Sequence, residues 1–283
     1  MQIGIHLPHA GEQATPTRIR DAALRAEALG LSDVWVSEHI IVPRSSFPRS
    51  PLFYDPVLSL TWAAAVTRRV RLGTSVLVLP MRHPLPLAKE LATLQNFSDG
   101  RLVLGVGVGW LEAEFRALGV PFRERGRRLD EGLAIMRAVW TQDPVTFRGR
   151  HIPAEIVEMS MTPLPIRPIP VWFGARSEPA LRRAVRVGDG WHGSQLTPEA
   201  AAPIVARLRR ERPDPGFTIS IRTHWNGADE GELRDRLGGY AAIGVQHVMV
   251  HPVDRDIDDW DAVIEGTGRV AARSPSLAAG RSP

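Results

Sequence analysis

The sequence predicts an α/β fold, a (β/α)8 TIM barrel with insertions at its C-terminal rim. Short apolar runs alternate with longer amphipathic runs along the chain, which is typical of parallel strands joined by crossover helices. Eight such units fit within 283 residues, a length usual for one closed barrel. An open, doubly wound sheet is the alternative that the alternation leaves.

The first four units occupy the N-terminal half of the chain. Their strands are short apolar runs, and their helices begin after capping residues or end near glycines. The strands are expected at 3–7, 33–39, 70–80 and 101–109, and the helices at 15–29, 56–69 and 83–97. Two helices, 111–119 and 124–141, follow the fourth strand.

The second half opens with a polar, proline-rich insertion that contains short strands near 145–147 and 156–159. The remaining strands are expected at 171–174, 190–194, 218–225 and 245–251, and the helices at 178–188, 198–211, 231–243 and 258–272. We therefore expect one domain over residues 1–272. The small and polar residues 273–283 are expected to form a disordered tail.

The composition is that of an ordinary globular protein, with 43% hydrophobic and 23% charged residues. The absence of cysteine excludes disulfides and thiolate chemistry and fits a reducing compartment. The chain opens directly on an expected strand, so we expect no signal peptide. No apolar run approaches the roughly 20 residues that span a bilayer. These features predict a cytoplasmic protein that binds no membrane.

The charge pattern does not predict a nucleic-acid-binding protein. The net charge is +4 although the pI is about 10.4, because Lys89 is the only lysine and the other cations are arginines. The arginines are mixed with acidic residues, as in 207–212, and no basic stripe with interleaved aromatic residues occurs.

The segment 70–80 is the most informative part of the chain. It reads as a buried strand that ends at Pro80, yet Gly73, Thr74 and Ser75 interrupt its apolar residues. Small residues in such a strand indicate a bulge or a place where a flat ligand approaches the backbone.

Two further groups of small residues lie where other strands end. Gly105, Gly107 and Gly109 leave one face of the fourth strand bare, which indicates either tight packing or a cofactor close to the backbone. The spacing is not that of a dinucleotide fingerprint. The segment 174–177 opens onto a helix, where it is either a plain helix cap or an anion site to which Arg176 adds charge.

Glu38 and His39 form a polar pair at the end of the second strand. His39 is either a structural hydrogen-bonding group or a group that donates a proton to a reacting atom. His6, His9, His39 and His83 could meet at one rim, but no ligand spacing supports a metal site, and we expect none.

Taken together, these residues resemble the bacterial luciferase-like monooxygenase superfamily, in its coenzyme F420-dependent branch. The resemblance runs from Met1 to about Ala272 and is most specific in five motifs. These are Ser37-Glu-His39, Gly73-Thr-Ser-Val-Leu-Val-Leu-Pro80, Arg101-Leu-Val-Leu-Gly-Val-Gly-Val-Gly-Trp110, Phe122-Arg-Glu-Arg-Gly-Arg-Arg-Leu-Asp130 and Gly188-Asp-Gly-Trp191.

The resemblance implies a role for each site. The third strand would carry a bulge with a non-prolyl cis peptide, here Ser75–Val76, that backs a deazaflavin ring beside Thr74. Glu38 would hydrogen-bond the polar edge of that ring, and His39 would lie near the reacting carbon as a proton donor or anion stabiliser. Both are therefore expected to be catalytic and to contact the cofactor.

The resemblance also implies the remaining contacts of the cofactor and the substrate. The backbone of Gly107, Val108 and Gly109 would contact the cofactor chain, and Gly174, Ala175, Arg176 and Ser177 would hold its phosphate. Members that oxidise sugar phosphates carry a glutamate where this chain has Trp110, which favours a more apolar substrate pocket. That pocket would be formed by Phe53, Tyr54, Trp110 and His6.

The implied function is an F420-dependent oxidoreductase that transfers a hydride between the deazaflavin and an apolar or aromatic small molecule. A monooxygenase that uses reduced FMN and oxygen is one alternative, because flavin and deazaflavin members share the barrel. A non-catalytic carrier of the deazaflavin is the other. The resemblance further implies a homodimer.

Overall fold

The computed structural model describes residues 1–256 and 259–273, and it confirms the (β/α)8 barrel. All the barrel strands pair in parallel, in the order β3-β2-β1-β11-β10-β9-β8-β5-β4, and the pairing of β3 with β5 closes the ring. The strands are β1 Gln2–His6, β2 Asp33–Val36, β3 Arg71–Thr74, β4 Leu77–Val78, β5 Leu102–Gly107, β8 Val171–Gly174, β9 Gly190–Ser194, β10 Thr218–His224 and β11 His247–His251.

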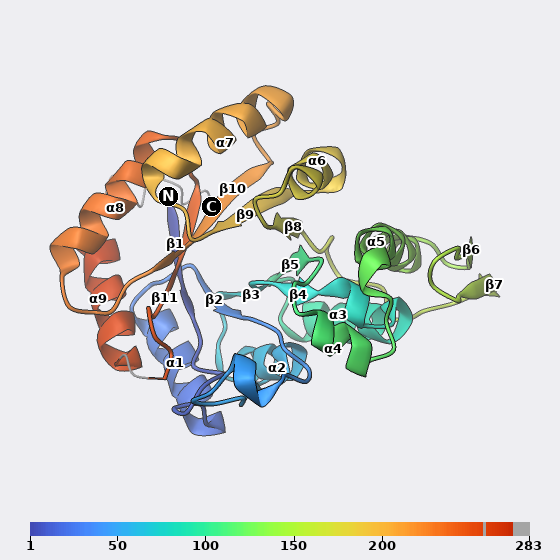
Figure 1. Ribbon diagram of the computed structural model, residues 1–283, viewed down its shortest axis with the longest axis horizontal. Coiled ribbons are helices and arrows are strands. Elements are labelled where there is room, and N and C mark those ends of the chain that lie inside the picture. The colour runs from blue at the N-terminus through green and yellow to red at the C-terminus, as the bar shows by residue number, and fades with distance from the viewer. Residues whose placement is uncertain (257–258, 274–283) are drawn as a thin grey trace.

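Helices cover the outside of the barrel (Figure 1). Eight of the described helices alternate with the strands as expected: α1 Pro16–Ala28, α2 Pro56–Val66, α3 Pro84–Phe97, α5 Arg125–Thr141, α6 Glu178–Val187, α7 Pro198–Glu211, α8 Glu230–Ala242 and α9 Trp260–Arg273. A further short helix, α4 Glu112–Ala117, lies at the C-terminal rim. The expected disordered tail lies outside the described residues, apart from Arg273, which ends α9.

Local sequence explains where several helices begin. Thr15, Asp55 and Thr197 each accept a hydrogen bond from a backbone N–H of the first turn, and each is followed by a proline at the first helical position. A helix held at its start in this way returns the chain to the barrel at a defined point.

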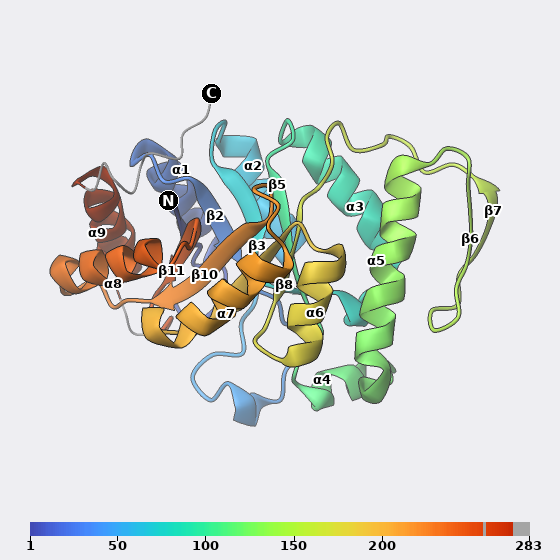
Figure 2. The same cartoon turned by 90° about the horizontal axis from the view of Figure 1, so that it is seen from above.

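The proline-rich insertion forms an antiparallel hairpin, β6 Val145–Arg148 and β7 Glu155–Met159. Figure 2 shows that it projects beyond α5, away from the barrel. None of the described helices is both long enough and apolar enough to cross a bilayer.

The barrel interior differs between its two ends. Trp35, Val103, Trp172 and Met249 form a separate buried cluster inside the ring of strands. Above them, towards the C-terminal ends of the strands, the interior opens into a cavity. The opening therefore lies where barrels of this class bind their ligands.

Candidate active site

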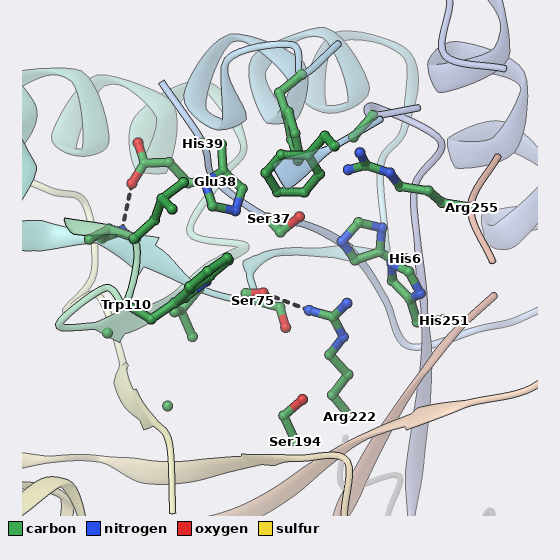
Figure 3. Close-up of a pocket in the computed structure, with 18 of the residues that line it drawn as sticks. His6, Ser37, Glu38, His39, Ser75, Trp110, Ser194, Arg222, His251 and Arg255 are labelled. Atoms are coloured by element: carbon green, nitrogen blue, oxygen red, sulfur yellow. Dashed lines mark hydrogen bonds between the residues drawn. The ribbon is translucent and has the colours of Figure 1, made fainter. Parts of the chain in front are cut away.

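The cavity measures about 740 Å3 and is lined by residues from the ends of the barrel strands and the loops that follow them. This volume falls in the range of pockets that hold small molecules and cofactors. Figure 3 shows Ser75 and Arg222 at its floor, with His6, His251 and Arg255 on one side and Glu38, His39 and Trp110 on the other.

The third strand is interrupted as the sequence predicts. The Ser75–Val76 peptide bond is cis, which confirms the predicted bulge, and the strand resumes as β4 beyond it. A Cβ atom placed on Gly107 or on Gly174 would lie 2.6 Å from a methyl group of Val76. These two glycines are therefore required by the close approach of Val76, and part of the glycine pattern reflects packing against the bulge.

Each small residue before the bulge has its own structural reason. A Cβ atom on Gly73 would lie 2.2 Å from the indole of Trp35, so only glycine leaves room for that side chain. Thr74 is buried, and its hydroxyl donates to the carbonyl of Gly105 at 2.7 Å. The hydroxyl of Ser75 lies 2.9 Å from Nε2 of His192, at the edge of the cavity.

His39 is held by a carboxylate of α4, the short helix at the C-terminal rim. Its Nδ1 lies 3.0 Å from Oε2 of Glu114, a residue of α4, and Oε1 of Glu114 accepts from the backbone N–H of Ile40 at 2.5 Å. Burial raises the pKa of Glu114, but the bonds from His39 and the backbone outweigh it and lower that pKa. The ionised carboxylate fixes the imidazole, which leaves Nε2 of His39 as the ring nitrogen available to the cavity.

The carboxylate of Glu38 is hydrogen-bonded within the protein. It accepts from the backbone N–H of Val78 and from Nε of Arg82, both at 2.5 Å. Arg82 also binds Asp55, and these two carboxylates outweigh the effect of burial and raise the pKa of Arg82. Glu38 therefore anchors β4, directly after the bulge, to the end of β2.

Arg222, in β10, places a cation at the cavity floor without a counter-ion. Its Nη1 donates to the carbonyl of Ser75 at 3.2 Å, and its Nε is buried with no hydrogen-bond partner. No described carboxylate acts on the pKa of Arg222, and the one charged group that does is the cation Arg255. Burial lowers the pKa of Arg222 to about 10, which still leaves it charged at neutral pH.

The histidines beside Arg222 carry no charge. Burial lowers the pKa of His224 to about 4, and it lowers the pKa values of His6 and His251 well below the usual range. These imidazoles are therefore neutral at pH 7. The Nε2 atom of buried His6 also has no hydrogen-bond partner. The floor thus offers a cation and imidazole nitrogens to a ligand that has hydrogen-bonding groups.

The opposite wall is aromatic. Phe47 and Phe53 pack edge to face at 5.3 Å, and each also contacts the ring of His39. The Cζ atom of Arg255 lies 4.4 Å from the centre of the Phe53 ring. Trp110 lies 6.0 Å from His39 and is 66% exposed, which places it at the mouth of the cavity.

The structure brings most of the predicted site residues to this cavity. Its lining includes His6, Glu38, His39, Phe53, Ser75, Val76, Gly107, Val108, Gly109, Trp110, Gly174 and Ala175. Four predicted site residues do not line the cavity. Thr74 faces Gly105, Tyr54 packs against the main core, and Arg176 and Ser177 lead exposed into α6.

Arg222, His224, His251 and Glu114 also line the cavity and are absent from the sequence-based prediction. One signal could have found two of them: Arg222 and His224 alternate with apolar residues in an expected strand, so they share its inward face. Glu114 gave no such signal, since its partner lies 75 residues away in sequence.

Comparisons with known proteins place the chain in a family. The model of the luciferase-like monooxygenase family matches residues 1–275. An F420-dependent glucose-6-phosphate dehydrogenase from Amycolatopsis mediterranei is 36% identical, over 96% of this chain and 88% of its own length. The uncharacterized protein Rv0953c from Mycobacterium tuberculosis is 32% identical, over 96% and 98% of the two chains.

Solved structures share the fold. An F420-dependent secondary alcohol dehydrogenase in complex with an F420–acetone adduct superposes with a TM-score of 0.78 at 20% identity, over 98% of both chains. The coenzyme F420-dependent tetrahydromethanopterin reductase from Methanopyrus kandleri gives a TM-score of 0.73 at 18% identity, over 95% of this chain and 97% of its own.

Proposed function

Since this chain belongs to the luciferase-like monooxygenase family, we propose that it is an oxidoreductase that uses coenzyme F420. It transfers a hydride between the deazaflavin of that cofactor and a small-molecule substrate. The observation that carries the proposal is the cavity floor, where a buried cation has no counter-ion among the residues that the structure describes. The curated relative named as an F420-dependent enzyme supports the choice of cofactor.

The residues of the cavity fit a ring whose polar edge carries both hydrogen-bond acceptors and a donor. Nε of Arg222 is a buried donor without a partner, which a ring carbonyl would satisfy. Nε2 of neutral His6 is a buried acceptor without a partner, because Nδ1 donates to the carbonyl of Leu7, and a ring N–H would satisfy it. The bulge at Val76, with Gly107 and Gly174 against it, presents backbone to the cavity rather than long side chains. A volume of about 740 Å3 leaves room for a ring and a substrate together.

The same rim would hold the rest of the cofactor. Val108 and Gly109 line the cavity beside the bulge, where they would contact the cofactor chain. Gly174 and Ala175 lead into the N-terminus of α6, whose free N–H groups favour a phosphate. Arg176 and Ser177, exposed at this turn, would reach such a phosphate from the solvent side.

When bound, the deazaflavin supplies a carbon centre that exchanges two electrons together as a hydride. His39 would position the substrate through Nε2, because Glu114 fixes the other ring nitrogen. The Glu38–Arg82 pair keeps β4 in register behind the bulge. Phe47 and Phe53 exclude water from the side of the cavity that contains His39.

The lining suggests a substrate with two unlike ends. Phe47, Phe53 and Trp110 would pack against an apolar or aromatic body. Arg222 would attract an electron-rich group at the floor. A substrate with an acceptor group would share the donors of Arg222 with the polar edge of the ring, which refines the apolar substrate expected from the sequence.

Equilibrium titration tests the choice of cofactor. Trp110 and Trp260 line the cavity, so their fluorescence should fall when the oxidised deazaflavin cofactor binds, with micromolar affinity. A parallel titration with FMN should give much weaker quenching. Preference for FMN, followed by oxygen uptake with reduced FMN, would replace this proposal with the monooxygenase alternative.

Turnover separates an enzyme from a carrier. With the cofactor bound, a panel of secondary alcohols and aromatic alcohols should bleach the absorbance of the oxidised deazaflavin. His39→Gln should lower that rate by roughly 100-fold or more while cofactor affinity survives. An unchanged rate in His39→Gln would favour the carrier alternative, and lost affinity would make His39 a binding contact. The expected homodimer stays a prediction, which light scattering checks.

A further inference from the structure

A chain of five buried side chains crosses the barrel interior beneath the cavity. Oγ of Ser75 lies 2.9 Å from Nε2 of His192, and Nδ1 of His192 lies 2.7 Å from Oγ of Ser220. Ser220 in turn lies 2.6 Å from Nδ1 of His247, whose Nε2 lies 2.8 Å from Oδ1 of Asp33. All five residues are buried, so an unbroken series of hydrogen bonds joins the cavity to the start of β2.

Strand register produces this series. Ser220 of β10 is paired with His192 of β9 on one side and with His247 of β11 on the other. The three side chains therefore share one level of the barrel and point the same way. Ser75 follows β3 at the upper end, while Asp33 begins β2 at the lower end.

The hydrogen bonds all run in one direction. Asp33 also accepts from Nη2 of Arg71 at 2.7 Å, so it is an ionised acceptor, and His247 must donate to it through Nε2. In the neutral imidazole, Nδ1 of His247 then accepts from Ser220, which accepts from His192. Nε2 of His192 is left to accept the hydrogen of Ser75.

This direction fixes what Ser75 can offer a ligand. Because its only hydrogen is donated to His192, the hydroxyl presents lone pairs to the cavity. A ligand at this point must therefore bring an O–H or N–H group. If that group loses its proton to Ser75, each hydrogen of the series can move to the next side chain.

Aromatic rings keep the series dry and hold its imidazoles in place. The indole of Trp35 stacks on His192 with an interplanar angle of 6° and lies 5.3 Å from His247. Trp172 lies against the same two histidines. Such interiors are usually filled with branched apolar residues, so five polar side chains are a costly choice for packing alone.

We propose that Ser75, His192, Ser220, His247 and Asp33 form a proton relay that accepts a proton from a ligand O–H or N–H group at the cavity floor. In the oxidation of an alcohol, the C–H bond gives its hydride to the deazaflavin, and the O–H proton passes to Ser75. This use of the relay rests on the proposed function.

The proton transfers balance along the series. Ser75 gives its own proton to Nε2 of His192, which releases the Nδ1 proton to Ser220, and Ser220 protonates Nδ1 of His247. His247 ends as an imidazolium beside the Asp33 carboxylate. The other charges that face His192 and His247 are the guanidinium groups of Arg222 and Arg71, and the latter is paired with Asp33. Reduction of a carbonyl runs every transfer in reverse.

An ionisable probe tests the relay without turnover. The probe is 4-nitrophenol, whose ionised form absorbs in the visible range, added to the cofactor-free protein slightly below neutral pH. Wild-type protein should bind it largely as the phenolate. Ser220→Ala interrupts the relay without touching the cavity, and it should lower the ratio of ionised to neutral probe by about tenfold, which corresponds to a rise of one unit in the pKa of the bound phenol.

Controls separate the relay from folding and from Arg222. His9→Gln removes another buried histidine whose partners are the carbonyls of Leu7 and Ser37, and it should leave the bound phenolate unchanged. Melting curves establish that each variant is folded. A folded Ser220→Ala protein that still ionises the probe as the wild type does would overturn the proposal.

Nitrogen-15 NMR of the ligand-free wild type gives a decision even if the phenol does not bind. The proposal requires a proton on Nδ1 of His192 and on Nε2 of His247, with both other ring nitrogens unprotonated. A spectrum with either tautomer reversed would contradict the direction of the series and overturn the relay.

A titration of bound cofactor identifies the source of the proton. If Ser220→Ala changes the pH dependence of the deazaflavin absorbance, the ring itself donates to Ser75, and the relay stands with the ring as its ligand. If only 4-nitrophenol responds, the substrate is the donor. Failure of the deazaflavin to bind, with the phenol response intact, would reject the proposed function and keep the relay.

Discussion

The lower half of the barrel interior and the cavity floor are both polar, yet they satisfy their polar groups differently. Below, the carboxylate of Asp33 and the imidazoles of His192 and His247 have partners at every polar atom. At the floor, Nε of Arg222 and Nε2 of His6 have none. Asp33, His192 and His247 are fully paired within the protein, although Nε of the neighbouring Arg71 is buried without a partner, whereas the floor lacks groups that a ligand can supply.

This difference assigns the two regions different energetic roles. Breaking a complete buried network leaves charges without partners and costs stability. Removing a cation that has no counter-ion costs little stability but takes away a binding group. The predictions below test that contrast, from the largest expected effect to the smallest.

Acid should weaken the fold through its buried histidines. Burial lowers the pKa of His9 to about 4 and that of His192 to about 3, whereas unfolded histidine titrates near 6.5. The unfolded chain therefore binds more protons below pH 6.5, and this stability is full above that pH. It should fall by about 1.4 kcal/mol per pH unit for each histidine as the pH drops towards 4.

Urea denaturation at a series of pH values checks this expectation. His83→Asn, which alters an exposed helix-capping histidine, should leave the profile as it is in the wild type. A free energy of unfolding that stays constant between pH 6.5 and 4.5 would show that the buried histidines are not held neutral.

Asp33→Asn should have the largest effect of any single substitution in the lower half. It removes the charge that pairs with Arg71 and receives the His247 bond, so the free energy of unfolding should fall by about 3–5 kcal/mol. Chemical denaturation measures the loss. Asp261→Asn, at a position 81% exposed, is the matched control and should change stability little. Equal effects of the two substitutions would refute the contrast.

Arg222→Met should lower ligand affinity rather than stability. Stability should be unchanged or slightly higher, because a buried charge without a counter-ion is removed. Affinity for the deazaflavin cofactor or the substrate should fall by about 10- to 100-fold, which corresponds to about 1.5–3 kcal/mol for a charged hydrogen bond. Arg186→Met, at a side chain that is 66% exposed and lies outside the cavity lining, is the control and should leave affinity unchanged. A large loss of melting temperature in Arg222→Met would make Arg222 part of the structural network.

Ser75→Ala should have a small effect on both properties, since Ser75 belongs to both regions. Loss of its bond to His192 should lower the free energy of unfolding by about 1 kcal/mol. Affinity for the cofactor should fall by less than tenfold. Melting curves and fluorescence titration of the same sample measure the two effects. A change confined to one property would place Ser75 wholly in one region.

The sequence predicted the architecture because barrel units repeat a local pattern. Apolar runs, capping residues and glycines near helix ends located the described strands and α-helices to within a few residues, but not the short 3-10 helices, one of which (Leu79–Met81) lies in the strand expected at 70–80. The cis geometry of the Ser75–Val76 peptide bond was predicted from the family resemblance rather than from the local pattern, and the structure confirms it.

The partners of the site residues could not be predicted, because they come from distant segments. Glu114 reaches His39 across 75 residues, and Asp33 reaches His247 across 214. The orientation of Glu38 likewise depends on Arg82, which lies 44 residues away. Tyr54 follows Phe53 in sequence but faces the core, since neighbouring residues of an extended segment point in opposite directions.

A crystal structure of the protein soaked with the deazaflavin cofactor tests the central claim most directly. The account predicts ring density against Ser75 and Val76, with a polar edge within hydrogen-bond distance of Arg222 or His6. Density for the ring outside the cavity, or an empty cavity at a saturating concentration of cofactor, would contradict it.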